Sequence, residues 1–185
     1  MIKAISALAA LALATGSAGA AQAAVTVIGG GLAEACSKAA VSGESDARFD
    51  DLCTTALETE YLNARDRAGT FVNRGVLRLR RAAYKVAERD FDVAVKAKPD
   101  MGEAYVNRGA AYIGQKRFSE SLGQINRGLE LGIQEPAKAY YNRALAYEGL
   151  EDAKSAYFDY QKALEIEPEW TAPKEQLLRF TVSRR

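Results

Sequence analysis

A nine-residue pattern occurs three times at nearly equal intervals, and it constrains the fold more than any other feature of the sequence. Each copy has an aromatic residue, Asn-Arg two positions later, and then Gly or Ala. The copies span residues 70–78, 104–112 and 139–147. Aligned on Gly75, Gly109 and Ala144, they lie 34 and 35 residues apart. Repeats of this length form one supersecondary unit each, and they bury their apolar faces only by stacking on their neighbours.

A second pattern follows each copy and indicates a second helix. It consists of a small residue, then a Phe, Tyr or Ile, then a second small residue, and finally a proline. These residues are Ala87, Phe91, Ala94 and Pro99, then Ser121, Ile125, Gly128 and Pro136, then Ala156, Tyr160, Ala163 and Pro168. On both patterns together, the chain resembles the tetratricopeptide repeat family. The resemblance implies an all-α fold, a short right-handed solenoid of helix-turn-helix hairpins with a C-terminal capping helix.

The repeats divide the chain into segments. We expect the three repeats at residues 68–101, 102–136 and 137–170. A degenerate helical hairpin precedes them at 32–66, and an amphipathic capping helix follows at 171–185. Such a cap gives the last repeat a polar outer face.

The N-terminus predicts export. Lys3 precedes an apolar run at residues 4–14, and Ala21-Gln22-Ala23 supplies the small residues of a cleavage point. This is the pattern of a bacterial secretory signal peptide over residues 1–23, and the run is too short to span a bilayer. We expect residues 24–31 to form a flexible leader, and the mature protein to be soluble in the periplasm or outside the cell.

Two cysteines, Cys36 and Cys53, lie in the predicted N-terminal hairpin. An even cysteine count in an exported chain favours a disulfide. The alternatives are a pair of buried free thiols, or a redox or metal pair, although no further ligands lie nearby. We expect no bound metal and no cofactor.

Each repeat has an arginine at the position where the tetratricopeptide repeat pattern usually has a leucine. Arg74, Arg108 and Arg143 each precede a polar residue by 16 positions, and those residues are Asp90, Gln124 and Asp159. Since an unpaired buried charge is costly, we expect structural ion pairs Arg74–Asp90 and Arg143–Asp159, within a repeat or between repeats. The alternative is that the three arginines bind an anionic ligand.

The resemblance also predicts a concave groove formed by the first helices. We expect its lining to be Val72, Asn73, Val76, Arg80, Val106, Asn107, Ala110, Ile113, Tyr141, Asn142, Leu145 and Glu148. In the family, asparagines such as Asn73, Asn107 and Asn142 can bind the backbone of an extended peptide. They could equally bond a neighbouring helix. Some members of the family bind a C-terminal carboxylate through a clamp of Lys, Asn and Arg. The residues beside the asparagines are mostly apolar here, which disfavours such a clamp and suits a hydrophobic peptide or a helix.

Composition limits the other classes of function. The chain has no histidine, which removes the commonest general base and most catalytic zinc sites. No phosphate-binding glycine loop occurs, so we expect no enzyme. Without Lys3 the charges balance, which argues against nucleic acid as a partner. The densest basic cluster, Arg78 to Arg81 with Lys85, either receives an acidic segment or lipid headgroup, or is a solvated helix end.

These observations predict an exported adaptor that binds a peptide or protein segment in its groove. The alternative is a structural subunit whose convex or terminal surfaces build an oligomer or an envelope complex. The partner's identity does not follow from the sequence.

Overall fold

The computed structural model describes residues 2–4, 19–28 and 31–182. The apolar run of the predicted signal peptide lies mostly outside these residues. The helices are α1 (Gly31–Val41), α2 (Arg48–Thr59), α3 (Ala64–Arg80), α4 (Tyr84–Ala97), α5 (Gly102–Gly114), α6 (Phe118–Leu131), α7 (Pro136–Gly149), α8 (Ala153–Ile166) and α9 (Thr171–Leu177). Two short strands, β1 (Ile2–Ala4) and β2 (Phe180–Val182), complete the described elements.

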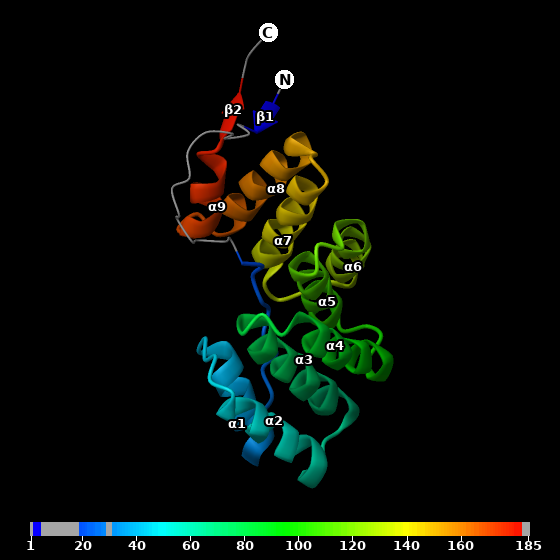
Figure 1. Ribbon diagram of the computed structural model, residues 1–185. Helices are drawn as coiled ribbons and strands as arrows, with labels where there is room; N and C mark the ends of the chain where they lie inside the picture. The colour runs from blue at the N-terminus through cyan, green and yellow to red at the C-terminus, as the bar shows by residue number, and fades with distance from the viewer. Residues whose placement is uncertain (1, 5–18, 29–30, 183–185) are drawn as a thin grey trace.

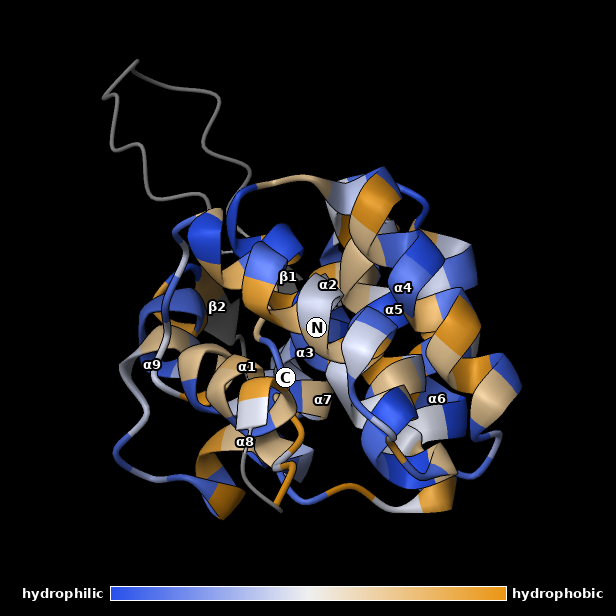
Figure 2. Ribbon diagram, turned by 90° about the horizontal axis from the view of Figure 1, so that it is seen from below, coloured by the Kyte–Doolittle hydropathy of each residue, from blue (hydrophilic) through white to orange (hydrophobic). Residues whose placement is uncertain are grey.

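The helices form antiparallel hairpins that stack in chain order (Figure 1). The pairs α3–α4, α5–α6 and α7–α8 correspond to the three expected repeats, although α3 starts at Ala64 and α7 at Pro136, before the expected bounds, and α1–α2 precedes them. Helices such as α4 and α6 carry both hydrophobic and hydrophilic residues (Figure 2), as helices with one buried face do. The all-α solenoid fold is confirmed.

Small residues let the two helices of a hairpin approach closely. A Cβ atom at Gly75 would lie 2.4 Å from Cε1 of Phe91, and one at Gly109 would lie 2.6 Å from Cγ1 of Ile125. In the third hairpin, Ala144 and Tyr160 are both fully buried in the same core cluster. The large residue of the second helix therefore packs directly on the backbone of the first, as close packing of the interior requires.

The first helix of each repeat ends in the same turn. Ala82, Lys116 and Glu151 have φ values of 56°, 61° and 62°, in the left-handed region. The next residue donates its N–H back across the turn in each case, from Ala83 to the Arg78 carbonyl, for example, at 3.0 Å. This is the hydrogen bond of a Schellman motif, which usually has Gly at the left-handed position. Because none of the three is Gly, the sequence does not mark this turn.

The predicted capping helix at 171–185 needs correction. Helix α9 ends at Leu177, and Phe180–Val182 pairs antiparallel with β1, Ile2 opposite Val182. Phe-Thr-Val favours a strand, and this arrangement buries Phe180 with its ring 5.8 Å from that of Tyr157 and 6.1 Å from that of Tyr160. The end of the stack is thus covered by a short helix and a strand.

The flexible leader expected at 24–31 also needs correction. Residues 20–28 run in an extended path beside α7, α5 and α3 and reach α1 (Figure 1), and Val25 and Val27 are buried. Backbone hydrogen bonds to side chains of these helices hold the segment, as described below. We call residues 20–28 the N-terminal segment. No helix among the described residues has the length and hydrophobicity that crossing a bilayer requires.

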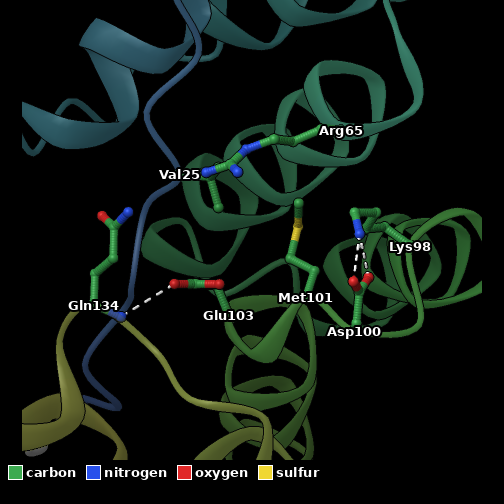
Figure 3. Close-up of a pocket in the computed structure, with 7 residues that line it drawn as sticks. All are labelled: Val25, Arg65, Lys98, Asp100, Met101, Glu103 and Gln134. Atoms are coloured by element: carbon green, nitrogen blue, oxygen red, sulfur yellow. Dashed lines mark hydrogen bonds and ion pairs between the residues drawn. The ribbon is translucent and has the colours of Figure 1, made fainter.

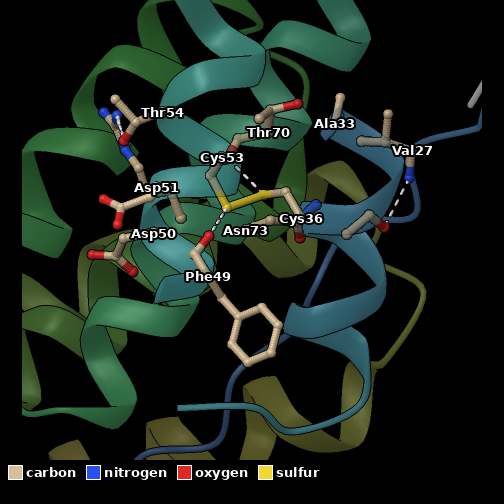
Figure 4. Close-up of a disulfide and its surroundings, with 12 residues drawn as sticks. Val27, Ala33, Cys36, Phe49, Asp50, Asp51, Cys53, Thr54, Thr70 and Asn73 are labelled. Atoms are coloured by element: carbon tan, nitrogen blue, oxygen red, sulfur yellow. Dashed lines mark hydrogen bonds between the residues drawn. A yellow bond between two sulfur atoms is a disulfide. The ribbon is translucent and has the colours of Figure 1, made fainter. Parts of the chain in front are cut away.

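A disulfide joins Cys36 of α1 to Cys53 of α2, with a Cα–Cα distance of 5.0 Å (Figure 4). Both residues are fully buried in the core cluster that continues into α3 and α4. The bond therefore links the two helices that have a stacked neighbour on one side only.

We predict that Cys36→Ala with Cys53→Ala lowers the free energy of unfolding by about 3 kcal/mol, because the unfolded chain loses a cross-link across a loop of this size. Denaturant unfolding of both proteins under oxidising conditions measures the difference. Adding a reductant should bring the original chain close to the double variant. Equal midpoints for both proteins without reductant would contradict a stabilising role.

Candidate functional site: an asparagine ladder in the groove

Three asparagines bind the backbone of the N-terminal segment in the same way. Asn142 Oδ1 accepts from the Ala21 N–H at 2.7 Å, and its Nδ2 donates to the Ala21 carbonyl at 2.7 Å. Asn107 makes the same two hydrogen bonds with Ala23, at 3.1 Å from the N–H and 2.7 Å to the carbonyl. Asn73 makes them with Val25, at 2.8 Å from the N–H and 2.7 Å to the carbonyl. Each side-chain amide thus pairs with both polar groups of a single residue, like the neighbouring strand in a sheet. We call this set the asparagine ladder.

The ladder contacts every second residue of the segment. Two residues of an extended chain advance about 6.6 Å, so this distance separates successive asparagines along the groove. The segment runs from the third repeat to the first, because Ala21 lies on α7, Ala23 on α5 and Val25 on α3. The groove therefore defines both the spacing and the direction of the strand that it holds.

The contact is buried on both sides. Asn73, Asn107 and Asn142 are each 0% exposed, and the residues that face the groove are Ala23 at 1%, Val25 at 8% and Val27 at 4%. Gln22, Ala24 and Thr26, which alternate with them, are more exposed. Since buried amides need partners for their donors and acceptor, the strand backbone satisfies the asparagines, and they satisfy the strand.

The floor of the groove differs between repeats. A Cβ at Gly69, one turn before Asn73, would lie 3.0 Å from Cγ1 of Val25 and 3.3 Å from Cγ2 of Val27. The corresponding residues before the other two asparagines are Glu103 and Lys138. Val25 and Val27 thus pack over the glycine, which makes room for these larger residues.

Ser37 on α1 extends the ladder, and the sequence analysis missed it. Its hydroxyl accepts from the Val27 N–H at 3.1 Å and donates to the Val25 carbonyl at 2.9 Å (Figure 4 shows the contact from Val27). Ser37 lies 36 residues before Asn73. That near-repeat spacing of a small polar residue was the available signal, but it differs from the 34- and 35-residue intervals of the repeats.

Hollows flank the segment. Ala110 and Ile113 line one of them together with Ala20, Gln22 and Arg80. A second hollow contains Gln22 and Ala24, bordered by Arg80, Glu135 and Lys138, of which the last two form an ion pair at 2.5 Å. A third lies beside Val25, where Glu103 accepts a hydrogen bond from the Gln134 backbone at 3.2 Å (Figure 3).

Several residues predicted to line the groove lie elsewhere. Val72 is fully buried in the core of the first repeats, and Val106 is in a core cluster with Ile125 and Ala139. These two valines lie in the core because the position before each asparagine is turned by one helical step from the groove face. Val76 is buried in the core cluster that Val25 of the N-terminal segment also joins.

In the third repeat, too, residues that were predicted to line the groove have structural contacts. The Tyr141 ring lies 5.5 Å from that of Tyr160 and 4.9 Å from that of Trp170, and burial raises the pKa of Tyr141 to about 12. Leu145 packs at the edge of this cluster, which Ala21 also contacts. Glu148 accepts a hydrogen bond from the Tyr160 hydroxyl at 2.6 Å and forms an ion pair with Arg179. It therefore joins α7 to α8 and to the residues that follow α9.

The repeated arginines join neighbouring hairpins. Arg74 pairs with Asp90 of its own hairpin at 2.7 Å and donates to Thr54 of the preceding one at 2.9 Å. Arg143 likewise pairs with Asp159 at 2.7 Å and donates to Asn126 at 2.8 Å. The hydrogen bond to Asp159 raises the pKa of Arg143.

Arg108 has equivalent partners, Gln124 in its own hairpin and Asp92, at 3.0 Å, in the preceding one. Each of these guanidinium groups also lies over the aromatic ring three residues before it, 5.2 to 5.4 Å from the ring centre. The arginines therefore fix the stacking of the hairpins and face away from the groove ligand.

The basic cluster is also paired. Arg78 contacts Asp50 at 3.1 Å and Asp90 at 2.6 Å, and Arg81 contacts Asp50 at 2.6 Å. Arg80 donates to the carbonyls of Ala40 and Glu44, and burial lowers its pKa. The described residues contain no group of acidic, Cys or His side chains that could hold a metal ion.

Comparison with known proteins agrees with the fold. The tetratricopeptide repeat model matches residues 137–169. The hairpin of α7 and α8 is therefore a tetratricopeptide repeat. Its fold is similar to that of MamA, with a TM-score of 0.61 and 19% identity over 82% of this chain and 84% of that one. It is also similar to the Arabidopsis OM64 TPR domain, with a TM-score of 0.59 and 22% identity over 63% of this chain and 96% of that domain.

Among curated proteins, the mouse sperm-associated antigen 1 is 34% identical over 87 residues, or 46% of this chain. The chain spans about a tenth of the length of that relative. Tetratricopeptide repeats generally mediate protein–protein interactions, and proteins built from them are typically non-catalytic scaffolds.

We predict that Asn107→Ala lowers the free energy of unfolding of the full chain by about 2 kcal/mol, because two hydrogen bonds to Ala23 are lost at about 1 kcal/mol each. In a chain that starts at Ala24, the same substitution should cost much less, since Ala23 is absent. Denaturant unfolding of the four proteins measures both costs. An equal cost in the two backgrounds would show that Asn107 does not hold the N-terminal segment.

Proposed function

We propose that this protein is an exported adaptor that binds an extended segment of a partner protein in its groove. The asparagine ladder carries this proposal, because it already holds an extended strand through backbone atoms alone. Such a contact is independent of side-chain identity, as in other modes of strand recognition. The choice between partner sequences then depends on which side chains fit the hollows beside the bound segment.

Export is part of the proposal. The basic start, the apolar run and the Ala21-Gln22-Ala23 site are typical of a bacterial signal peptide, and the disulfide fits an oxidising compartment. Cleavage after Ala23 would remove two of the three residues that the ladder holds, and β1 with them. Asn107 and Asn142 would then be open to a partner in the periplasm or outside the cell.

The balance of charge and the paired arginines favour a protein partner over nucleic acid or a lipid surface. The described residues contain no group that could hold a metal ion, and proteins built from tetratricopeptide repeats are typically non-catalytic scaffolds, so we assign the protein a binding role. Neither consideration identifies the partner.

A peptide with the sequence of residues 17–23, labelled at its N-terminus and amidated at its C-terminus, tests the proposal. We predict that it binds the chain from Ala24 to Arg185, and that Asn107→Ala raises the Kd at least tenfold by removing two hydrogen bonds. Fluorescence anisotropy measures the Kd. Lys162→Ala, on the outer helix α8, is the matched control and should leave it unchanged.

Binding that survives Asn107→Ala would move recognition to another surface. That result would favour the alternative of a structural subunit that assembles through its convex or terminal surfaces. Absence of any binding by the unmodified groove would contradict the adaptor proposal itself.

A further inference from the structure

We propose that the processed groove takes the carboxyl-terminal end of a peptide that ends in Ala-x-Ala, and that the α-ammonium group of Ala24 holds the terminal carboxylate. This inference rests on the proposed function and on cleavage between Ala23 and Ala24. It specifies the direction in which the peptide lies, which of its two ends is bound, and the positions that take small side chains.

The half of the groove beyond the cleavage point keeps its own strand. Val25 remains on Asn73, and Val27 remains on Ser37. These residues lie within seven positions of α1, to which the chain connects them. The new amino terminus at Ala24 is therefore held at a defined place, next to the position that Ala23 occupied.

The other half loses its occupant. Asn107 and Asn142 then have no strand backbone beside them, although both amides are turned into the groove. A peptide that restores all four hydrogen bonds has to lie in the direction of the lost residues, from α7 towards α5. Its last residue then occupies the place of Ala23, and its carboxylate points at Ala24.

Hydrolysis makes the two ends complementary. One water is consumed, the Ala23–Ala24 peptide bond breaks, and the two sides become a carboxylate and an ammonium group. A free peptide in the same place sets opposite charges next to each other, where attraction is strongest. Arg80 borders the hollow beside Gln22 and Ala24, where Glu135 and Lys138 form an ion pair. The preference for an acidic terminus over an amide therefore rests on the Ala24 ammonium group.

The side chains set the sequence. The residues at the Ala21 and Ala23 positions face the groove. Ala23 is almost wholly buried, so its position requires a small residue, and Ala21 is partly buried against the aromatic cluster of α7 and α8, which favours a small residue there. The residue between them, Gln22, borders the hollows and is free to vary. Small-x-small before a free carboxylate is also how cleaved signal peptides end. Released signal peptides, including the one predicted here, are thus the chemical class that fits.

The test compares two versions of the peptide Ser-Ala-Gly-Ala-Ala-Gln-Ala, residues 17–23, with a free carboxylate and with a terminal amide. We expect the acid to bind the chain Ala24–Arg185 at least tenfold more tightly than the amide, by calorimetry or anisotropy. Asn142→Ala should weaken both versions by a similar factor, since it lies away from the terminus. An acid peptide with Leu as its last residue should bind at least tenfold more weakly than the Ala peptide.

The outcomes separate the two proposals. Equal affinity of acid and amide, both lost in Asn107→Ala, would overturn the role of Ala24 and leave peptide binding by the groove intact. Equal binding of the Leu peptide would overturn the size limit at the last position. Failure of acid and amide alike to bind would overturn this inference together with the adaptor proposal.

Discussion

Buried primary amides are the constraint on which this groove depends. An asparagine side chain has two N–H donors and a carbonyl acceptor, and burying them without partners costs more than a hydrogen bond returns. In Asn73, Asn107 and Asn142 the carbonyl and one N–H pair with the backbone of an extended strand, and Asn107 also donates to the Glu103 carbonyl at 2.9 Å. A strand laid along the groove presents the same two groups at every second residue, so one geometry serves all three positions.

The ladder works only because the repeats hold it in register. Small residues such as Gly75 and Gly109 set how closely the helices of a hairpin approach. Arginines such as Arg143 join each hairpin to the preceding one through carboxylate, amide and aromatic contacts. The spacing of successive asparagines is therefore fixed by packing outside the groove. The strand does not create the site but fits one that the solenoid has already built.

Much of this architecture could be predicted from the sequence. The 34- and 35-residue intervals indicate the hairpins, and the cysteine pair indicates the disulfide. Arg74 and Arg143 indicate ion pairs with the carboxylates 16 residues away. These features depend on local patterns that repeat. The N-terminal segment could not be predicted to fill the groove, because its binding uses backbone atoms and leaves only a short run of small residues in the sequence.

Other details depend on helix rotation. Tyr141 and Asn142 are neighbours in sequence, yet one packs in the core against Trp170 and the other binds Ala21 in the groove. A pattern that identifies the helix does not fix its rotation to within one residue, and Val72 and Val106 were misplaced for the same reason. Ser37 and strand β2 belong to the ends of the array, where the repeat pattern fades and gives no register.

Residue-resolved amide hydrogen exchange of the full chain tests most directly whether the N-terminal segment is held by the ladder. The account predicts an alternation. The amides of Ala21, Ala23, Val25 and Val27 should be protected by their side-chain acceptors, and those of Gln22, Ala24 and Thr26 should exchange rapidly. Uniform rapid exchange from residue 20 to residue 28 would show that the asparagines do not bind this strand in solution.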